Sequence, residues 1–115
     1  MILHITKELD WSAAESSGLY RADSLAAEGF IHCSTLKQVL DTANTLFRGQ
    51  DGLVLLCIEP EHVVAPILFE DCYESGQLFP HIYGPLNVDA VSAVLPFSAD
   101  IHGRFYLPDE LVAPG

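Results

Sequence analysis

The chain has 115 residues, half of them hydrophobic, and its 16 acidic against 5 basic side chains give a formal net charge of -11. This length suits one domain with its own core, and this composition excludes a disordered chain. Without a basic stripe to neutralise phosphates, neither nucleic acid nor an anionic membrane is expected as a partner. No targeting leader and no apolar run of roughly 20 residues is visible, so we expect residues 1–115 to fold as a single cytoplasmic domain.

The first half of the chain alternates between strand and helix character. The predicted elements are strands over 2–6 and 30–34, helices over 7–17 and 35–47, a short extended piece over 19–21, and a polar loop or helical turn over 23–29. Thr6 is the predicted N-cap of the first helix, and Gly18 is its predicted end. Ser34 or Thr35 is the predicted cap of the second helix, whose apolar residues recur at helical spacing before Gly49.

The second half is richer in strands. Predicted strands cover 53–58, 66–71 and 91–97, a turn covers 59–62, a segment framed by proline and glycine covers 76–85, and a helical turn or loop begins at 88. The first of these strands is apolar throughout, which predicts a buried central strand, whereas Pro66 favours a sheet edge for the second. An apolar patch at 105–107 precedes an acidic tail that we expect to fray. This order of elements predicts an α+β fold.

Three cysteines, Cys33, Cys57 and Cys72, stand in no metal-ligand spacing. We interpret them as buried, reduced thiols of an intracellular protein. Cys33 follows His32 directly, which raises the question of a Cys-His nucleophile. Because adjacent strand residues face opposite sides, we expect Cys33 in the core and His32 outside it, and a buried thiol is inert.

Three times in this chain a histidine stands two residues before a hydroxyl side chain. The pairs are His4 with Thr6, His32 with Ser34, and His81 with Tyr83. Alternate side chains of a strand point the same way, so each pair would present an imidazole and a hydroxyl on one face. We therefore hypothesise that three strands converge on one polar cleft whose groups bind ligands and move protons.

Two of these motifs also have a purely structural explanation. Ser34 could act only as a helix cap, and Pro80 could stop strand pairing at a sheet edge while the aromatic residues near it belong to the core. The same rigid segment, with His81 and Tyr83, could equally form an aromatic wall for a flat ring. Where a strand end meets a helix start, as at Ser34, a bound anion is also favoured.

Few cations are available to hold an anionic ligand. Arg21 is the candidate for pairing with phosphate, with Tyr20 beside it for stacking, whereas Arg48 at a helix end is expected to be solvated. His62 and His102 lie in predicted loops and receive no role. The other histidines could bind zinc or iron, but no spacing of the His-x-His or His-Glu-x-x-His type brings two ligands together, so no metal is expected.

Two longer strings resemble a known family. Residues 29–35 and 78–86 resemble the signatures of a small bacterial family catalogued as domain of unknown function nine-five-two, and residues 3–6 and 53–58 match it as well. That family is grouped by fold with the ADP-ribosyltransferases, whose domains bind NAD in a cleft between two small, mostly antiparallel sheets. Within that fold group, the chain most resembles the RNA 2'-phosphotransferases. The resemblance implies an ADP-ribosylation-like fold flanked by two principal helices, with NAD or a related nucleotide as substrate or ligand.

The resemblance also implies roles for individual residues. His4 would contact the adenosine or ribose side of the nucleotide, and His32 the nicotinamide-ribose side. Glu70 is the best stand-in for the carboxylate that assists ribosyl transfer, and His32 and His81 are the other catalytic candidates. The remaining residues expected to line the nucleotide site are Thr6, Tyr20, Arg21, Ser34 and Tyr83.

Two functions from different classes remain open. The first is an enzyme that cleaves or transfers at the ribose anomeric carbon through an oxocarbenium-like state, with a protein among the conceivable acceptors. The second is a nucleotide-sensing or protein-binding module that kept the cleft and lost catalysis. The lack of an obviously placed transferring glutamate and the small number of cations support this second function. Ile5 also stands where the resemblance implies a glycine. A metal-dependent hydrolase is a third hypothesis.

Overall fold

The structure is a computed structural model, and it describes residues 1–112. In chain order its elements are β1 (Ile2–Lys7), α1 (Glu8–Ser17), β2 (Leu19–Tyr20), α2 (Asp23–Glu28), β3 (Ile31–His32), α3 (Val39–Leu46), β4 (Leu53–Ile58), β5 (Ile67–Glu70), β6 (Phe79–Ile82), β7 (Leu86–Asn87) and β8 (Val91–Phe97). Single turns of 3-10 helix occur at Pro60–His62, Val88–Ala90 and Asp109–Leu111. The last part of the predicted frayed tail, 113–115, lies outside the described residues.

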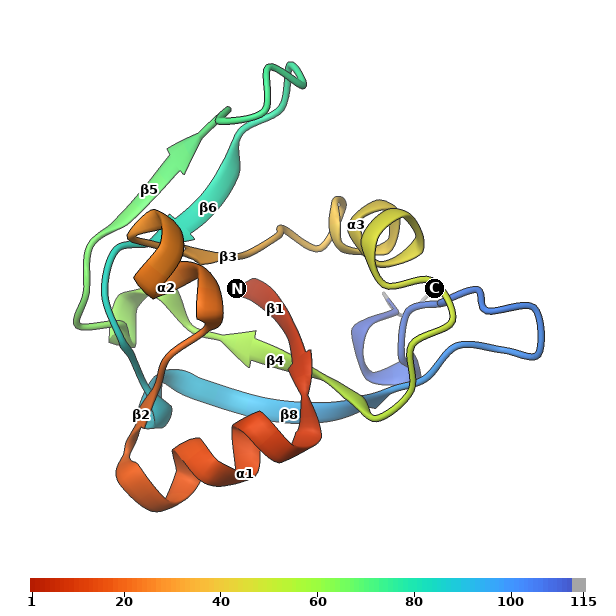
Figure 1. Ribbon diagram of the computed structural model, residues 1–115, viewed down its shortest axis with the longest axis horizontal. Coiled ribbons are helices and arrows are strands. Elements are labelled where there is room, and N and C mark those ends of the chain that lie inside the picture. Colours follow the sequence, from red (N-terminus) through yellow and green to blue (C-terminus); the bar gives the residue numbers. More distant parts are fainter. Residues whose placement is uncertain (113–115) are drawn as a thin grey trace.

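The described strands form three small antiparallel sheets, which confirms the α+β prediction (Figure 1). Their orders are β1-β4-β8, β2-β7 and β3-β6-β5. Immediately after β3, Ser34 exchanges two backbone hydrogen bonds of 2.8 Å with Leu3 of β1. This bridge joins the first sheet to the third and brings the chain around His4 next to the chain around His32.

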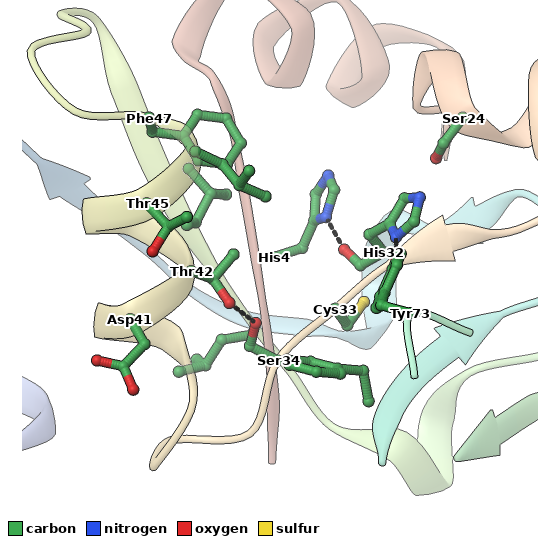
Figure 2. Close-up of a pocket in the computed structure, with 14 residues that line it drawn as sticks. His4, Ser24, His32, Cys33, Ser34, Asp41, Thr42, Thr45, Phe47 and Tyr73 are labelled. Atoms are coloured by element: carbon green, nitrogen blue, oxygen red, sulfur yellow. Dashed lines mark hydrogen bonds between the residues drawn. The ribbon is translucent and has the colours of Figure 1, made fainter. Parts of the chain in front are cut away.

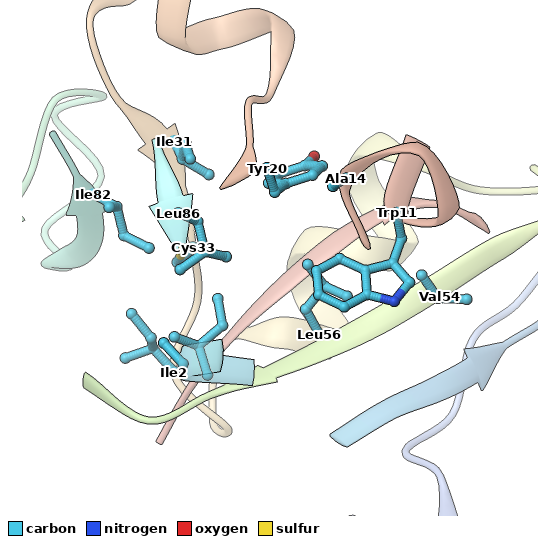
Figure 3. Close-up of a cluster of buried hydrophobic side chains, with 12 residues drawn as sticks. Ile2, Trp11, Ala14, Tyr20, Ile31, Cys33, Val54, Leu56, Ile82 and Leu86 are labelled. Atoms are coloured by element: carbon cyan, nitrogen blue, oxygen red, sulfur yellow. The ribbon is translucent and has the colours of Figure 1, made fainter. Parts of the chain in front are cut away.

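The central strand β4 supplies both halves of the core, as its continuous apolar run predicted. Val54, Leu56 and Ile58 face one cluster, which also contains Trp11 of α1 and is drawn in Figure 3. The residues between them, Leu53, Leu55 and Cys57, face a second cluster under α3 and the C-terminal segment. Two-residue alternation therefore places one face of the sheet toward α1 and the other toward α3.

The two predicted helix caps are wrong. β1 extends to Lys7, and the Thr6 hydroxyl bonds to Tyr20, so no side chain caps α1. The second predicted helix starts later than expected, because residues 36–38 form turns and α3 begins at Val39 without a side-chain cap. Ser34 instead directs its hydroxyl to Thr42 Oγ1 at 3.3 Å. The predicted end of the first helix is confirmed, since Gly18 adopts a left-handed φ of 85°.

Pro80 lies in the middle strand of its sheet, contrary to the interpretation that it stops pairing at an edge. Its carbonyl accepts a hydrogen bond of 3.0 Å from the Cys33 amide. Proline has no amide hydrogen to return that bond, and the ladder between β3 and β6 ends here. The predicted edge strand at 66–71 is confirmed as β5, at the outside of the same sheet.

None of the helices within residues 1–112 has the length and apolar character that crossing a membrane requires.

Candidate functional site

A cavity of about 550 Å³ lies between α3, the middle of β1 and the chain at the end of β3. Figure 2 shows Thr42, Thr45 and Phe47 on its α3 side and His4 and His32 on the opposite side. Apolar and aromatic groups dominate the lining, whose members are Leu3, His4, Ile5, Ser24, His32, Cys33, Ser34, Asp41, Thr42, Thr45, Leu46, Phe47, Tyr73 and Phe79. A space of this size and character suits a small organic ligand with a flat apolar part.

A second cavity, of about 500 Å³, lies between β1, α1 and the segment 19–23. It contains Thr6, Tyr20 and Arg21, three of the residues predicted from the sequence to bind nucleotide. Both cavities are lined by His4, Ile5 and Phe47, so they adjoin each other at these side chains. The second cavity is also the more charged of the two, because Lys7, Asp10, Arg21 and Asp23 all line it.

His4 is positioned by hydrogen bonds on both ring nitrogens. Its Nδ1 donates to the His32 carbonyl at 2.5 Å, which links β1 to β3. Its Nε2 lies 2.8 Å from the Tyr20 hydroxyl, which in turn lies 2.9 Å from Thr6 Oγ1. Burial lowers the pKa of His4 to about 4, so the ring is neutral at pH 7 and Nε2 is an acceptor.

The polar chain at His4 consequently has a definite direction. Burial raises the pKa of Tyr20 to about 12, so this phenol keeps its proton. When Tyr20 donates to His4, its oxygen is free to accept from Thr6, since either hydroxyl can donate in that contact. The first dyad thus shares a face of β1, as predicted, and its two members meet at one tyrosine.

His32 forms a more exposed group at the mouth of the first cavity. Its Nε2 donates to the Glu28 carboxylate at 2.7 Å, and its side chain remains 37 % exposed. The Tyr73 hydroxyl contacts Nδ1 from the other side. Nε2 therefore carries the ring proton that Glu28 accepts, and Nδ1 is an acceptor engaged by the Tyr73 hydroxyl. A substrate hydroxyl that takes the place of Tyr73 at Nδ1 would meet the arrangement of a general base. Ser34 points elsewhere, toward Thr42, because β3 has already ended.

The third dyad lies in a different place from the other two. His81 is fully buried, and Tyr83 and Glu70 line neither cavity. His81 Nδ1 and the Tyr83 hydroxyl both donate to Glu70 Oε1, at 3.0 Å and 2.5 Å. These bonds lower the pKa of Glu70, and the bond to Glu70 raises the pKa of Tyr83 to about 12. The hypothesis that all three dyads line one cleft is therefore wrong, although the His32 and His81 rings are only 5.4 Å apart.

The cysteines agree with the prediction in two of three cases. Cys33 and Cys57 are buried, and burial raises the pKa of Cys33, as expected of an inert thiol. Cys72 is exposed, so its predicted burial is wrong. It follows β5 in a loop, where no sheet covers it.

A family model described as "Protein of unknown function (DUF952)" matches residues 5–94. The chain belongs to the DUF952 family. The matched range contains the second and third dyads and Glu70, whereas His4 lies just before it. Because the family description names no activity, the function has to be argued from the site.

Solved structures of CC0527 from Caulobacter crescentus are similar to this DUF952 chain over nearly its whole length. One crystal structure is 36% identical, with a TM-score of 0.86 and 96% of each chain covered. A double mutant of the same protein gives a TM-score of 0.85 at 36% identity, again with 96% of each chain covered. The solution NMR structure gives 0.71 at 34% identity, covering 89% of this chain and 88% of that one. No curated protein matches the chain.

The sequence did not indicate several groups of this DUF952 site. Glu28 and Tyr73 hold His32 from two sides, and the cavity wall formed by α3 includes Asp41 and Thr45. Glu28 precedes His32 by four residues across a turn, a spacing that could have suggested contact. Tyr73 comes from a loop about forty residues away, and only the fold brings it to His32.

Proposed function

We propose that this DUF952 protein binds NAD or a related nucleotide across the two adjoining cavities, within an ADP-ribosyltransferase-like fold. The observation that carries the proposal is the position of His4, a neutral histidine at the junction of a mainly apolar cavity and a charged one. A dinucleotide has the same two characters, with flat rings joined by a charged phosphate bridge. Small antiparallel sheets around the cavities are in keeping with the proposed fold.

Each cavity suits a different part of such a ligand. Tyr73, Phe79 and Phe47 supply apolar and aromatic surface in the first cavity for a nicotinamide or adenine ring. In the second, Arg21 and Lys7 supply cations for phosphate. The Thr6 hydroxyl, which adjoins Tyr20 in this cavity, would accept from a ribose hydroxyl.

The chemistry we propose is cleavage at the ribose anomeric carbon, with nicotinamide as the leaving group. His32 is the catalytic candidate that the geometry favours, because Glu28 orients it and its Nδ1 side faces Tyr73 and the first cavity. As general base, its Nδ1 would take the proton from the attacking hydroxyl of water or of an acceptor, once that hydroxyl has replaced Tyr73 as the partner of Nδ1. The roles expected for Glu70 and His81 receive no support, since both lie outside the cavities.

A module that binds the nucleotide without cleaving it is the second candidate. The position of Glu70 favours this module. The carboxylate expected to assist ribosyl transfer accepts hydrogen bonds from His81 and Tyr83 and does not line a cavity. Under this alternative the His4 and His32 contacts serve recognition only.

Thermal unfolding with NAD, ADP-ribose and ADP tests the binding site. Binding at a hundredfold excess over Kd stabilises the folded state by about 2.7 kcal/mol, which is visible as a higher Tm. His32→Ala should abolish this increase, whereas His102→Ala, an exposed histidine away from both cavities, should retain it. If none of the three nucleotides raises the Tm of the unaltered protein, the proposed function is wrong.

Chromatographic detection of nicotinamide separates the two candidates. Release from NAD by the unaltered protein, lost in His32→Ala, supports the enzyme. A raised Tm without release supports the binding module.

A further inference from the structure

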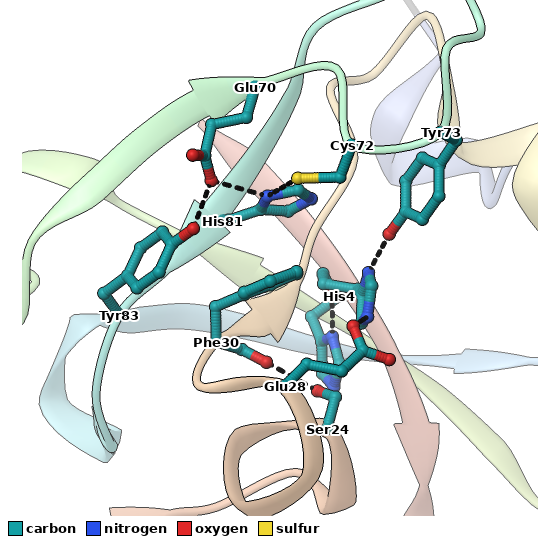
Figure 4. Close-up of polar contacts among 10 residues, drawn as sticks. His4, Ser24, Glu28, Phe30, Glu70, Cys72, Tyr73, His81 and Tyr83 are labelled. Carbon is teal, nitrogen blue, oxygen red and sulfur yellow. Dashed lines mark hydrogen bonds and ion pairs between the residues drawn. The ribbon is translucent and has the colours of Figure 1, made fainter.

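A second group of chemically reactive side chains lies outside both cavities, on the hairpin of β5 and β6. Glu70 is the last residue of β5, Cys72 follows in the loop, and His81 lies in β6 opposite Leu68. One carboxylate oxygen, one sulfur and one imidazole nitrogen from these residues all lie within 4.8 Å of one another. Figure 4 shows Glu70 and Cys72 converging on the His81 ring.

Both contacts of His81 use the same ring nitrogen. Nδ1 lies 3.0 Å from Glu70 Oε1 and 3.8 Å from Cys72 Sγ. The other nitrogen, Nε2, is buried and has no hydrogen-bond partner within residues 1–112. A nucleophilic Cys-His-carboxylate relay needs both nitrogens, one for the thiol and one for the carboxylate. The geometry therefore argues against a relay. It instead brings three potential metal ligands together: a Glu70 oxygen, the Cys72 sulfur and His81 Nδ1.

The surroundings hold two of the three donors in place. His81 is fully buried and its ring stacks on Phe30 at a centroid distance of 4.1 Å. The Tyr83 hydroxyl donates to Glu70 at 2.5 Å, the kind of outer contact that orients a ligating carboxylate. The loop that carries Cys72 is closed by Asp71, whose carboxylate accepts hydrogen bonds from the amides of residues 75 and 76 at 2.8 and 2.7 Å.

We propose that Glu70, Cys72 and His81 form a binding site for Zn²⁺. Sulfur, imidazole nitrogen and carboxylate oxygen are the donors that zinc takes in proteins, and harder ions such as Mg²⁺ or Ca²⁺ would not select the thiolate. Cys72 is exposed, which gives the ion a path to the site and leaves a fourth position for water. On binding, Cys72 becomes a thiolate and its proton passes to the solvent, while His81 binds through Nδ1 as the neutral ring.

No local spacing indicates this site, because Glu70 and Cys72 lie eleven and nine residues before His81, across a hairpin. No metal was expected from spacing alone. Zinc here would tie the loop after β5 to β6, a connection made at present by weaker hydrogen bonds.

Metal titration of the reduced full-length protein tests the proposal. Competition with a chromogenic chelator should give one Zn²⁺ per chain, and Co²⁺ should produce the intense thiolate charge-transfer absorption of a tetrahedral site. Cys72→Ser should abolish that absorption, and both Cys72→Ser and Glu70→Gln should weaken zinc binding at least about tenfold. Glu74→Gln, which removes a charge from the same loop but no donor, should bind as the unaltered protein does.

Circular dichroism separates loss of the site from loss of the fold. Cys72 is exposed, so Cys72→Ser should keep the unaltered spectrum, and only the unaltered protein and Glu74→Gln should gain Tm when Zn²⁺ is added. Failure of the unaltered protein to bind Zn²⁺ stoichiometrically would overturn the proposal, as would equal binding by Cys72→Ser. The nucleotide tests with His32→Ala do not depend on this outcome, because the three donors line neither cavity.

Discussion

At the scale of single residues, folding changes the chemistry of His4 most clearly. The residue is 8% exposed, and burial is the largest cause of a pKa lowered to about 4. Protonation would place a charge in the core and remove the lone pair that accepts from Tyr20. His4 is therefore a neutral group at pH 7 that lines both cavities, whereas His32 stays partly open to solvent.

This environment predicts a stability that depends on pH. The unfolded chain protonates His4 near its ordinary pKa of 6.5 and the folded chain only near 4, so the unfolded state holds more protons between these values. The free energy of unfolding should accordingly fall as the pH drops from 6.5 to 4, with a contribution from His4 of roughly 3 kcal/mol. Urea unfolding at a series of pH values measures it.

His4→Gln is the matched variant for this measurement, because glutamine can hydrogen-bond but does not titrate. The difference in unfolding free energy between the unaltered protein and this variant should shrink steadily from pH 6.5 to pH 4. A difference that stays constant over that interval would show that His4 titrates alike in both states.

The residue pairs also show how far alternation along a strand can be trusted. His4 with Thr6 and His81 with Tyr83 each meet a shared partner, Tyr20 and Glu70 respectively, as strand geometry predicts. His32 with Ser34 does not, because the ladder ends in between. Local spacing indicated which side chains share a face of a strand, but not which part of the molecule that face contacts. It could not indicate the contact between Tyr73 and His32, which are far apart in the sequence.

At the scale of elements, the types of most helices and strands followed from hydrophobic period and from glycine. β4, β8 and the end of α1 are where the sequence places them. The errors concern hydroxyl residues that precede helices. Thr6 and Ser34 are of the residue types that commonly cap helices, but their hydroxyls bond to other side chains. A side chain with several available partners is decided by tertiary contacts, which no local pattern contains.

The segment after β6 gives a prediction at this scale. Gly84 has a φ of 156°, and a Cβ added there would lie 2.9 Å from the Cβ of Ala65. The neighbouring Tyr83 amide donates to the Pro66 carbonyl at 2.8 Å, so the two segments cannot separate without losing a bond. Gly84→Ala should destabilise the fold by about 1–3 kcal/mol through overpacking and backbone strain. Urea unfolding gives the value.

A second substitution distinguishes the clash from the strain. Ala65→Gly removes the atom that the new Cβ meets, so the double variant should recover part of the loss even though Ala65→Gly alone is not stabilising. Strictly additive effects would mean that the two residues are not in contact.

At the scale of the whole molecule, net charge limits which ligands the proposed site can take. The chain carries a net charge of -11, and the charged cavity is lined by the cations Lys7 and Arg21 together with Asp10 and Asp23. Two phosphates of a dinucleotide can be held by such a local pair of cations. A polyanion extends beyond the cavity and meets the surrounding carboxylates, without enough counterion release to compensate.

This charge predicts a clear difference from enzymes that act on RNA. A fluorescently labelled single-stranded RNA bearing a 2'-phosphate should show no saturable change in anisotropy with this protein at physiological salt. Lowering the salt should not produce binding either, because repulsion between like charges grows as screening is removed. The increase in Tm that NAD produces should change little over that salt range. RNA binding that strengthens steeply at low salt would instead reveal a basic surface path, and would assign the cavities beside His4 and His32 to an RNA end.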